Sequence, residues 1–319
     1  MRTLLAGGAG FIGSHLADAL LAREHQVTVV DNLVTGRSQN IEHLSVHPNF
    51  EFLNHDVSIP LPDVPSLQRP FDLVVNMASP ASPSAFKEMP LEILAVGSSG
   101  TRNLLERALT DNARFFFAST SEVYGDPLLH PQSETYFGNV SSIGPRSCYD
   151  EAKRFSEALI MAYSRVSDLK VQIVRIFNTY GERMNPNDGR VVNTFIVQAL
   201  RDEPLTVHGT GRQSRSFCYV ADQVAGIIAM IDSELSGPIN IGNPSEITML
   251  NLATLIVEIA NSKSPIVSVP VPSEREGDPL QRCPDITLAR DLLDWEPAME
   301  LREGLTRMIH YFRTIERIG

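Results

Sequence analysis

The chain has 319 residues, of which 43% are apolar and 20% charged, the ordinary balance of a globular protein with a core of its own. Its net charge of −11 argues against general binding to nucleic acid or to an anionic membrane, and no apolar run reaches membrane-spanning length. The three cysteines are widely spaced without a metal-ligand pattern, so we expect no metal site and assume the reduced thiols of a cytoplasmic protein.

The start of the chain predicts a unit that binds a dinucleotide. An apolar strand leads into Gly7, Gly10 and Gly13, an amphipathic helix follows over 11–23, and a second strand ends at Asp31. Gly7 permits the tight turn, Gly10 lets the backbone approach a pyrophosphate at the helix N-terminus, and Gly13 lets the helix lie against the strand. Asp31 would bind the adenosine ribose and repel a 2′-phosphate, which favours NAD over NADP.

The next segments continue this pattern. A strand is expected over 46–53, followed by Asp56, which would either meet the adenine amino group or form a strand-end turn; the spacing leaves both open. A Pro-rich loop covers 60–70. The apolar run 71–78 indicates a parallel strand buried on both faces, and Ser79 follows it at the carboxyl end, where ligands of such sheets bind.

The alternation of strands and helices along the first half predicts an α/β fold of the Rossmann type, a doubly wound parallel sheet. The expected elements are helix 91–109, strand 113–119, helix 148–165 and strand 171–177, then helix 191–200, strand 205–208, a basic loop over 209–216, helix 219–231 and strand 238–241. We therefore expect an NAD-binding domain over 1–177, to which the chain returns around 216–242. A smaller mixed α/β substrate-binding domain would cover 178–319.

Tyr149 and Lys153 indicate a base on the predicted helix 148–165. Four residues make about one helical turn, so both side chains share a face. An ammonium beside a phenol favours the phenolate and lowers its pKa, so Tyr149 would act as a base near neutral pH. Thr120, at the end of the preceding strand, can bind the same substrate hydroxyl. Taken singly the pair is typical of a helix surface; beside the dinucleotide unit it indicates catalysis.

Together these residues resemble the extended short-chain dehydrogenase/reductase superfamily, which contains nucleotide-sugar epimerases, dehydratases and decarboxylases. Six motifs look like those of the UDP-glucuronate decarboxylases (UDP-xylose synthases) within it: TSEVYGDP at 120–127, HPQSE at 130–134, GPR at 144–146, RIFNTYG at 175–181, NDGRVV at 187–192 and GDP at 277–279. The resemblance implies NAD-dependent conversion of UDP-glucuronate to UDP-xylose, through oxidation at C4, loss of CO₂ and reduction by the same cofactor.

The resemblance also implies roles for individual residues. The catalytic set would be Tyr149, Lys153, Thr120, Glu122, Ser121 and Arg282. In this set Arg282 matches the family's arginine for the C6 carboxylate, and Ser121 and Glu122 match residues that manage the carboxylate and the C5 proton. Ser121 argues against a 4,6-dehydratase, because those enzymes carry an aspartate acid at this position and a serine hydroxyl is a poor acid.

Ligand contacts follow from the dinucleotide unit and the resemblance together. NAD would contact Gly7, Gly10, Phe11, Ile12, Gly13, Asp31, Asn32, Thr35, Gly36, Asp56, Val57, Met77, Ala78, Ser79, Tyr149, Lys153 and Thr179. The nucleotide sugar would contact Asn178, Arg190, Val191, Arg215 and Arg282. Arginine suits a diphosphate because its planar fork forms bidentate bonds. The arginines at 183, 190, 212, 215 and 282 therefore predict a local anion site in an acidic protein.

One departure from the family pattern leaves the product open. Ala95 and Gly97 stand where these enzymes carry a lysine and an asparagine near the sugar, unless Lys87 supplies the charge instead. The alternatives are a UDP-hexuronate 4-epimerase, a decarboxylase that releases the 4-keto pentose and, from another class, an NAD-binding regulator without catalysis. The resemblance also implies a homodimer, with helices 91–109 and 149–165 as the candidate interface.

Overall fold

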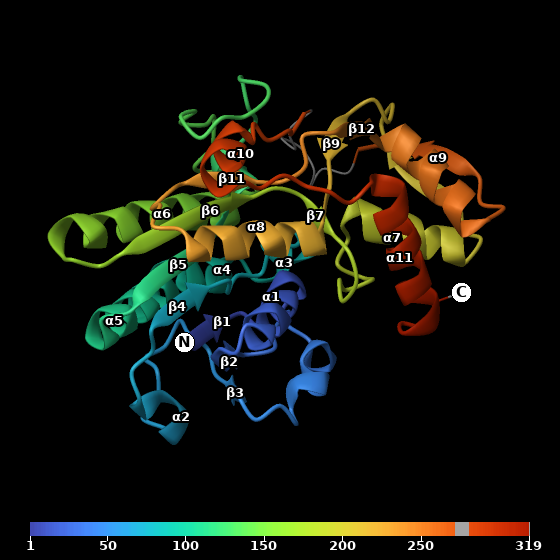
Figure 1. The fold of residues 1–319 in the computed structure, drawn as a ribbon. Coiled ribbons are helices and arrows are strands. Elements are labelled where there is room, and N and C mark those ends of the chain that lie inside the picture. Colours follow the sequence, from blue (N-terminus) through green and yellow to red (C-terminus); the bar gives the residue numbers. More distant parts are fainter. Residues whose placement is uncertain (272–280, 319) are drawn as a thin grey trace.

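The computed structural model describes residues 1–271 and 281–318, so the GDP motif at 277–279 lies outside the described residues. Its centre is a parallel sheet of seven strands in the order β11-β6-β5-β4-β1-β2-β3 (Figure 1). The strands are β1 Arg2–Ala6, β2 Gln26–Asp31, β3 Phe50–Asn54, β4 Leu73–Asn76, β5 Arg114–Thr120, β6 Val171–Ile176 and β11 Ile239–Ile241. The predicted Rossmann-type fold is confirmed.

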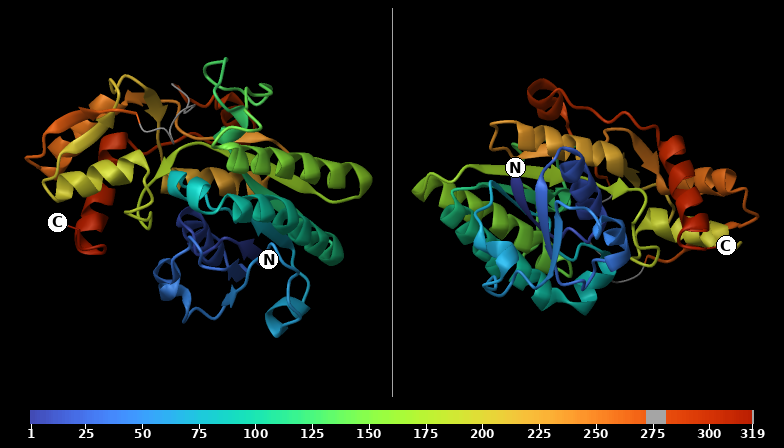
Figure 2. Two further views of the ribbon diagram at one scale, coloured as in Figure 1. Left: turned by 180° about the vertical axis from the view of Figure 1, so that it is seen from behind. Right: turned by 60° about the horizontal axis from the view of Figure 1, so that its bottom comes forward.

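Helices cover both faces of the sheet, as the apolar strands require. Helices α1 (Phe11–Ala22) and α8 (Val220–Asp232) pack together on one face, while α5 (Thr101–Asp111) and α6 (Ser147–Val166) cover the other (Figure 2). Successive residues of β5 serve opposite faces: Phe116 belongs to the core on the α1 and α8 side. Phe115 and Phe117 belong to the core under α5 and α6.

The second half of the chain builds a smaller lobe beside the carboxyl edge of the sheet. Its parallel pair is β8 (Leu205–His208) and β13 (Ile266–Val269), its antiparallel pair β9 (Ser214–Ser216) and β12 (Glu246–Thr248), and β7 (Thr179–Tyr180) pairs with β10 (Cys218–Tyr219). Around them lie α7 (Val191–Leu200), α9 (Met249–Ala260) and α11 (Leu301–Thr314), whereas α10 (Thr287–Leu293) packs on α8 and β11 of the large sheet. Between β10 and β12 the chain returns to the large sheet and forms α8 and then β11, which pairs with β6.

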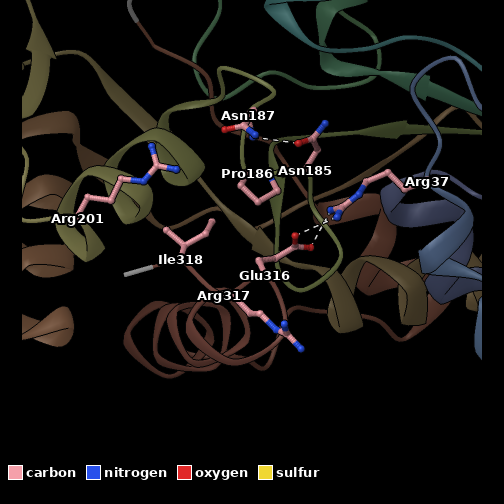
Figure 3. A pocket seen from close by; sticks show the side chains of 8 residues that line it. All are labelled: Arg37, Asn185, Pro186, Asn187, Arg201, Glu316, Arg317 and Ile318. Atoms are coloured by element: carbon pink, nitrogen blue, oxygen red, sulfur yellow. Dashed lines mark hydrogen bonds and ion pairs between the residues drawn. The ribbon is translucent and has the colours of Figure 1, made fainter.

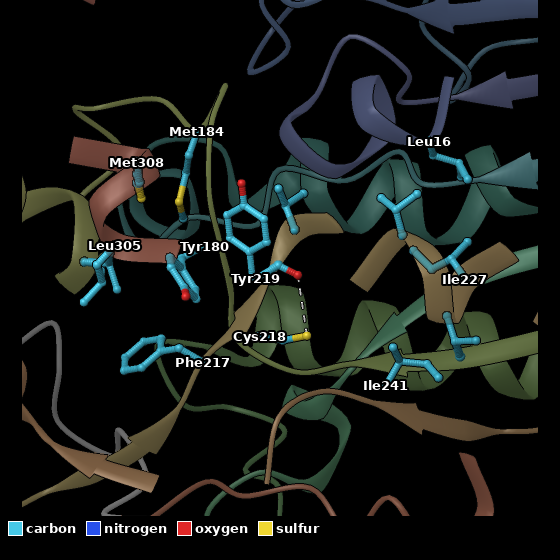
Figure 4. Close-up of a cluster of buried hydrophobic side chains, with 14 of the residues drawn as sticks. Leu16, Tyr180, Met184, Phe217, Cys218, Tyr219, Ile227, Ile241, Leu305 and Met308 are labelled. Atoms are coloured by element: carbon cyan, nitrogen blue, oxygen red, sulfur yellow. Dashed lines mark hydrogen bonds between the residues drawn. The ribbon is translucent and has the colours of Figure 1, made fainter. Parts of the chain in front are cut away.

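One apolar cluster joins the two lobes. Figure 4 shows Leu16 of α1 and Ile227 of α8 at one end, with Tyr180 and Tyr219 between them and Met308 of α11 at the other end. These side chains are nearly all buried, so separating the lobes would expose a continuous apolar surface. The relative position of the two lobes is therefore fixed by packing.

Three predicted elements differ in detail from the structure. The third strand starts at Phe50, because 46–49 form a turn in which Val46 is exposed. The basic loop 209–216 contains β9, which the sequence does not signal because Ser214–Ser216 has no apolar run. The helix expected over 91–109 is divided into α4 (Pro90–Ala95), a π-helical turn η3 (Val96–Gly100) and α5. Short turns at η1 (Ser38–Asn40), η2 (Glu42–Leu44), α2 (Pro65–Gln68), α3 (Pro83–Glu88) and η4 (Ser121–Tyr124) complete the chain.

The structure also bears on the expectations about membrane spans and cysteines. Within the described residues, no helix combines the length and the apolar character needed to cross a membrane. The three cysteines are free and buried.

Candidate active site

The glycine turn has the geometry that a bound pyrophosphate requires. Gly7 adopts φ +79° and its N–H donates to Val30 O at 2.9 Å, and a Cβ at Gly7 would lie 2.7 Å from the Ala78 nitrogen. A Cβ at Gly13 would lie 2.1 Å from Gly7 O, so only glycine allows α1 to approach the turn. No side chain caps α1 at Gly10, which leaves the N–H groups of the first helical turn directed at the carboxyl edge of the sheet.

Asp31 lies at the end of β2, where a ribose-binding acid belongs. Its carboxylate accepts hydrogen bonds from Ala9 N at 3.0 Å and Leu33 N at 2.9 Å, and it lies so close to Gly36 that a Cβ there would be 2.7 Å from an oxygen. Burial raises the pKa of Asp31, and the two backbone donors oppose that shift. The donor set and the uncapped helix fit NAD: a diphosphate at the helix and a free ribose 2′-hydroxyl at the acid.

The other cofactor candidates surround this edge. Asp56 accepts from Ser58 N at 2.8 Å, which is the turn role, and its second oxygen accepts from Asn32 at 3.2 Å. Val57 is buried against η3, and Met77, Ala78 and Ser79 follow β4 beside the glycine turn. Thr179 donates to Phe177 O at 2.9 Å and to Gln223 Oε1 at 3.1 Å. Thr35 is exposed in the loop that carries Gly36.

Arg37 ties this loop to the C-terminal tail, a connection that the sequence does not indicate. Its N–H donates to Ala9 O in the glycine turn at 3.0 Å, and its guanidinium binds both oxygens of Glu316 at 2.8 and 3.0 Å. Figure 3 shows this ion pair at one side of a pocket of about 330 Å³ that Asn185, Asn187 and Arg201 also line. The C-terminal tail therefore contacts the loop that follows Asp31, the candidate ribose-binding acid.

Tyr149 and Thr120 come together where β5 ends and α6 begins. The two side chains are hydrogen-bonded, and Tyr149 stacks on Phe86 of α3 with ring centroids 4.9 Å apart. Both are more than nine-tenths buried, so the pair is shielded from water. A substrate hydroxyl that reaches Tyr149 would meet Thr120 as well, as the sequence predicts.

In the protein without its cofactor, burial outweighs the predicted lowering of the pKa of Tyr149 by Lys153. Burial raises the pKa of Tyr149 to about 12, and the nearby Glu122 adds to the rise. Lys153 Nζ lies 5.9 Å from the Tyr149 ring centroid and donates to Ala118 O at 2.8 Å. Burial also lowers the pKa of Lys153 to about 8. The helical spacing correctly places the two residues on one face, but it contains no information about desolvation.

Glu122 and two arginines form a buried charged cluster next to this pair. Arg282 binds both oxygens of Glu122, with Nη2 at 2.8 Å from Oε2, and Arg146 Nη2 lies 2.6 Å from the same oxygen. Burial alone would raise the pKa of Glu122, but the two guanidinium groups outweigh it and hold the pKa well below its usual range. The sequence placed Glu122 and Arg282 in one site; Arg146 appeared only within a motif, and its pairing across 24 residues had no local signal.

Asp150 is a second acid at this cluster that the sequence did not single out. It lies in the first turn of α6, is 6% exposed, and is influenced by Glu122, Arg146 and Arg282. Burial, followed by the negative charge of Glu122, raises its pKa. The i, i+4 spacing of Arg146 and Asp150 was the available signal, because it puts both on one helix face.

The substrate candidates are distributed over the second lobe. Arg190 binds Asp188 at 3.0 Å and Ala81 O at 2.8 Å, and its positive charge acts to lower the pKa of Tyr149. Arg215 donates to Ser214 O in β9, Asn178 O accepts from Cys218 N, and Val191 begins α7. Of the five arginines that predict an anion site, Arg183 binds Asp18 of α1 at 2.7 Å. Ser121, which follows Thr120 in the chain, is buried.

The departure at 95–97 has a structural counterpart. A Cβ at Gly97 would lie 2.7 Å from the Ala152 Cβ, and Ser156 Oγ donates to Gly97 O at 2.7 Å. The π-helical turn therefore packs directly against α6, and the missing side chain at 97 matches this close approach. Lys87 is exposed on α3, and its neighbour Phe86 is the residue that contacts Tyr149.

Comparison with known proteins identifies the family. Residues 3–242 match the model of the NAD dependent epimerase/dehydratase family. The chain belongs to this family. It is 49% identical to UDP-glucuronic acid decarboxylase 1 of Xenopus tropicalis, over 98% of this chain and 72% of that protein. It is equally similar, at 49%, to UDP-glucuronic acid decarboxylase 5 of Arabidopsis thaliana, over 98% of this chain and 89% of that one. The resemblance to UDP-glucuronate decarboxylases is confirmed, and NAD is the cofactor of the family.

A solved family member gives the same fold at lower identity. The UDP-glucuronic acid 4-epimerase of Bacillus cereus, in complex with UDP-glucuronic acid and NAD, superposes with a TM-score of 0.88 at 29% identity, covering 99% of this chain and 100% of that one. Family membership and fold are therefore shared with a 4-epimerase, while the higher sequence identity is to decarboxylases.

Proposed function

We propose that this chain converts UDP-glucuronate to UDP-xylose and CO₂. The observation that carries the proposal is the cluster of Glu122 with Arg282 and Arg146 beside the Tyr149–Thr120 pair. Removal of a proton from a sugar hydroxyl requires only Tyr149 and Thr120. Two buried guanidinium groups next to this pair suit a substrate that also brings a carboxylate. The decarboxylases at 49% identity support the same reaction.

The first step removes the proton of the C4 hydroxyl. Bound NAD supplies the reversible oxidation at C4 and a positive charge beside Tyr149. Tyr149 accepts the hydroxyl proton while Thr120 binds the same oxygen and fixes its orientation. Lys153, buried one turn away, contributes a second positive charge that favours the ionised phenol.

The second step breaks the bond between C5 and the carboxyl carbon. Once C4 is a ketone, the carboxylate is β to it, and CO₂ leaves with the bond electrons delocalised as an enolate onto the C4 oxygen. Thr120 and the protonated Tyr149 hydrogen-bond to that oxygen and stabilise the charge. Arg282 holds the carboxylate beforehand, in place of one of its two bonds to Glu122.

The remaining residues hold the rest of the substrate and the cofactor. Segment 178–319 is proposed as the nucleotide-sugar domain, with Asn178, Arg190, Val191 and Arg215 along the diphosphate side, and segment 1–177 as the NAD domain. Glu122 is held as a carboxylate by two guanidinium groups, so its role in this scheme is to orient Arg282.

Product analysis tests this proposal directly. The enzyme is incubated with UDP-glucuronate labelled in the carboxyl carbon, CO₂ is counted, and the sugar is followed by NMR, with Tyr149→Phe as the inactive control. We expect CO₂ and UDP-xylose in equal amounts. UDP-galacturonate without CO₂ would establish the 4-epimerase instead, and CO₂ with a released 4-keto pentose would show that reduction fails.

We also propose a homodimer formed through α4, α5 and α6. Leu91 and Leu94 of α4 are 75% and 42% exposed, and Phe155 of α6 is 48% exposed, although all three are apolar. Light scattering should give a dimer mass for the native chain and a monomer mass for the double variant Leu94→Glu/Phe155→Glu. Val46→Glu, a change at an exposed turn, should leave the dimer intact. A monomeric native chain would rule out this interface.

The free, buried state of the three cysteines fits a reducing compartment, and we propose that the protein is cytoplasmic. Fractionation of the source cells with an antibody to the chain tests the location. Recovery in an oxidising compartment would contradict it.

A further inference from the structure

We infer that Asp150 supplies the proton that C5 gains after CO₂ has left, an assignment that rests on the proposed function. The reaction needs such a donor, because UDP-xylose carries a hydrogen at C5 in place of the lost carboxylate. Glu122 is a poor donor because two guanidinium groups bind its oxygens. Within the described part of the chain, the other acid on which this cluster acts is Asp150.

The position of Asp150 suits a proton donor better than a structural acid. Its Oδ1 is buried and has no hydrogen-bond partner among the described residues, and the residue is only 6% exposed. A structural carboxylate in a helix first turn normally satisfies both oxygens with backbone N–H groups or water. An unpartnered buried oxygen beside a site for an anionic substrate is therefore a group available to a ligand.

The surroundings of Asp150 separate the two acids of the cluster. The charged and titratable groups that act on it include Glu122 of η4, Arg282 of the segment after 280 and Arg146 at the N-terminus of α6, together with Cys148, Tyr149 and Glu151 of its own helix. Glu122 takes up most of the guanidinium contacts and stays ionised, while burial and the charge of Glu122 favour the protonated form of Asp150. When the environments of two neighbouring carboxyls shift their pKa values in opposite directions, one is present as an anion and the other as an acid.

The substrate itself would reinforce this division. A uronate carboxylate entering beside Arg282 brings another negative charge, which disfavours ionised Asp150 further. When CO₂ leaves, that charge moves to the enolate at C4. The O–H bond of Asp150 then breaks, the C5–H bond forms with the enolate electron pair, and Asp150 remains as a carboxylate beside Arg146 and Arg282. A proton from solvent restores it before the next turnover.

The test compares Asp150→Asn with Glu151→Gln, the same carboxyl-to-amide replacement one residue further along α6, where the side chain is more than one-third exposed. Asp150→Asn should lower kcat by about 100-fold, the lower end of what a general acid contributes, with the KM for UDP-glucuronate changed less than about threefold. The fall of wild-type kcat as the pH rises through the pKa of Asp150 should disappear in Asp150→Asn. Glu151→Gln should retain both the rate and that pH profile.

A binding measurement keeps the inference testable if Asp150→Asn does not fold. Tyr149→Phe binds substrate without turnover, and calorimetry in two buffers of different ionisation enthalpy counts the protons exchanged. We expect proton uptake near pH 7 with UDP-glucuronate and none with UDP-glucose, which lacks the carboxylate. Equal proton exchange with both ligands, or an unchanged kcat and pH profile in Asp150→Asn, would overturn the role of Asp150. Absence of CO₂ from the wild type would instead overturn the proposed function.

Discussion

Replacing Arg282 by alanine tests whether the buried cluster binds the substrate carboxylate. Arg282 is 5% exposed and makes two charge-assisted hydrogen bonds to Glu122, and a uronate would use the same two nitrogens. Two such bonds are together worth about 3–6 kcal/mol, which corresponds to a fall in kcat/KM of about 10²- to 10⁴-fold. Within segment 1–177 Arg282 hydrogen-bonds to Glu122 and not to the glycine turn or Asp31, so NAD binding should be unchanged.

The assay measures CO₂ from carboxyl-labelled UDP-glucuronate and the NAD content of the purified protein. Arg290→Ala is the matched control. Arg290 follows Arg282 by eight residues, is exposed, and pairs with Glu296. Its kcat/KM should stay within about twofold of the wild type. Retention of CO₂ release within tenfold in Arg282→Ala would refute the carboxylate role, and loss of NAD would show that the change acts through folding.

Three further changes test other parts of the structure. Glu316→Gln removes the anionic partner of Arg37 and should speed NAD dissociation about threefold to tenfold, measured by stopped-flow fluorescence; an unchanged rate would mean that the tail does not hold the cofactor loop. Gly97→Asn should destabilise the protein by about 1–3 kcal/mol in urea unfolding, because the new side chain overlaps Ala152; a stabilised variant would contradict the packing. Because the pKa of Glu122 is lowered from 4.5 to about 2, its ionisation stabilises the fold above pH 4.5, and this contribution is lost as the pH falls from 4.5 towards 2. Glu122→Gln should therefore weaken the dependence of the free energy of unfolding on pH in this range.

Much of the fold was predictable because local patterns determine it. The buried strands are apolar runs bounded by turns, and both α7 and β8 have the bounds that periodicity predicts. The elements that the sequence did not predict, β9 and η3, have no local sequence pattern. β9 is a polar strand stabilised by pairing with β12, and η3 is a π-helical turn whose cause is the contact of Gly97 with α6. Both depend on partners more than 30 residues away.

The candidate site was predictable to a similar depth. Tyr149, Thr120 and the glycine turn follow from spacing within one or two elements, so sequence places them correctly. The pairing of Glu122 with Arg282 spans 160 residues, and only the resemblance to a family brought the two together. The pKa of each group depends on burial, which spacing does not encode, and burial raises the pKa of Tyr149 in the protein without its cofactor.

In the proposed mechanism two neighbouring residues serve two different carbons of the sugar. Tyr149 and Asp150 are adjacent, so their side chains leave α6 about 100° apart. Tyr149 meets Phe86 and Thr120, whereas Asp150 shares a face with Arg146 and the charged cluster. The ring of Tyr149 therefore packs against Phe86, while the charges of Glu122, Arg190 and Asp150 still act on its hydroxyl. Because a negative charge on Asp150 raises the pKa of Tyr149, the two groups remain electrostatically coupled. Thr120→Asp puts a further negative charge beside Tyr149 and should therefore impair C4 oxidation more than substrate binding. Single-turnover absorbance at 340 nm measures the oxidation, and KM is compared with it as the measure of binding.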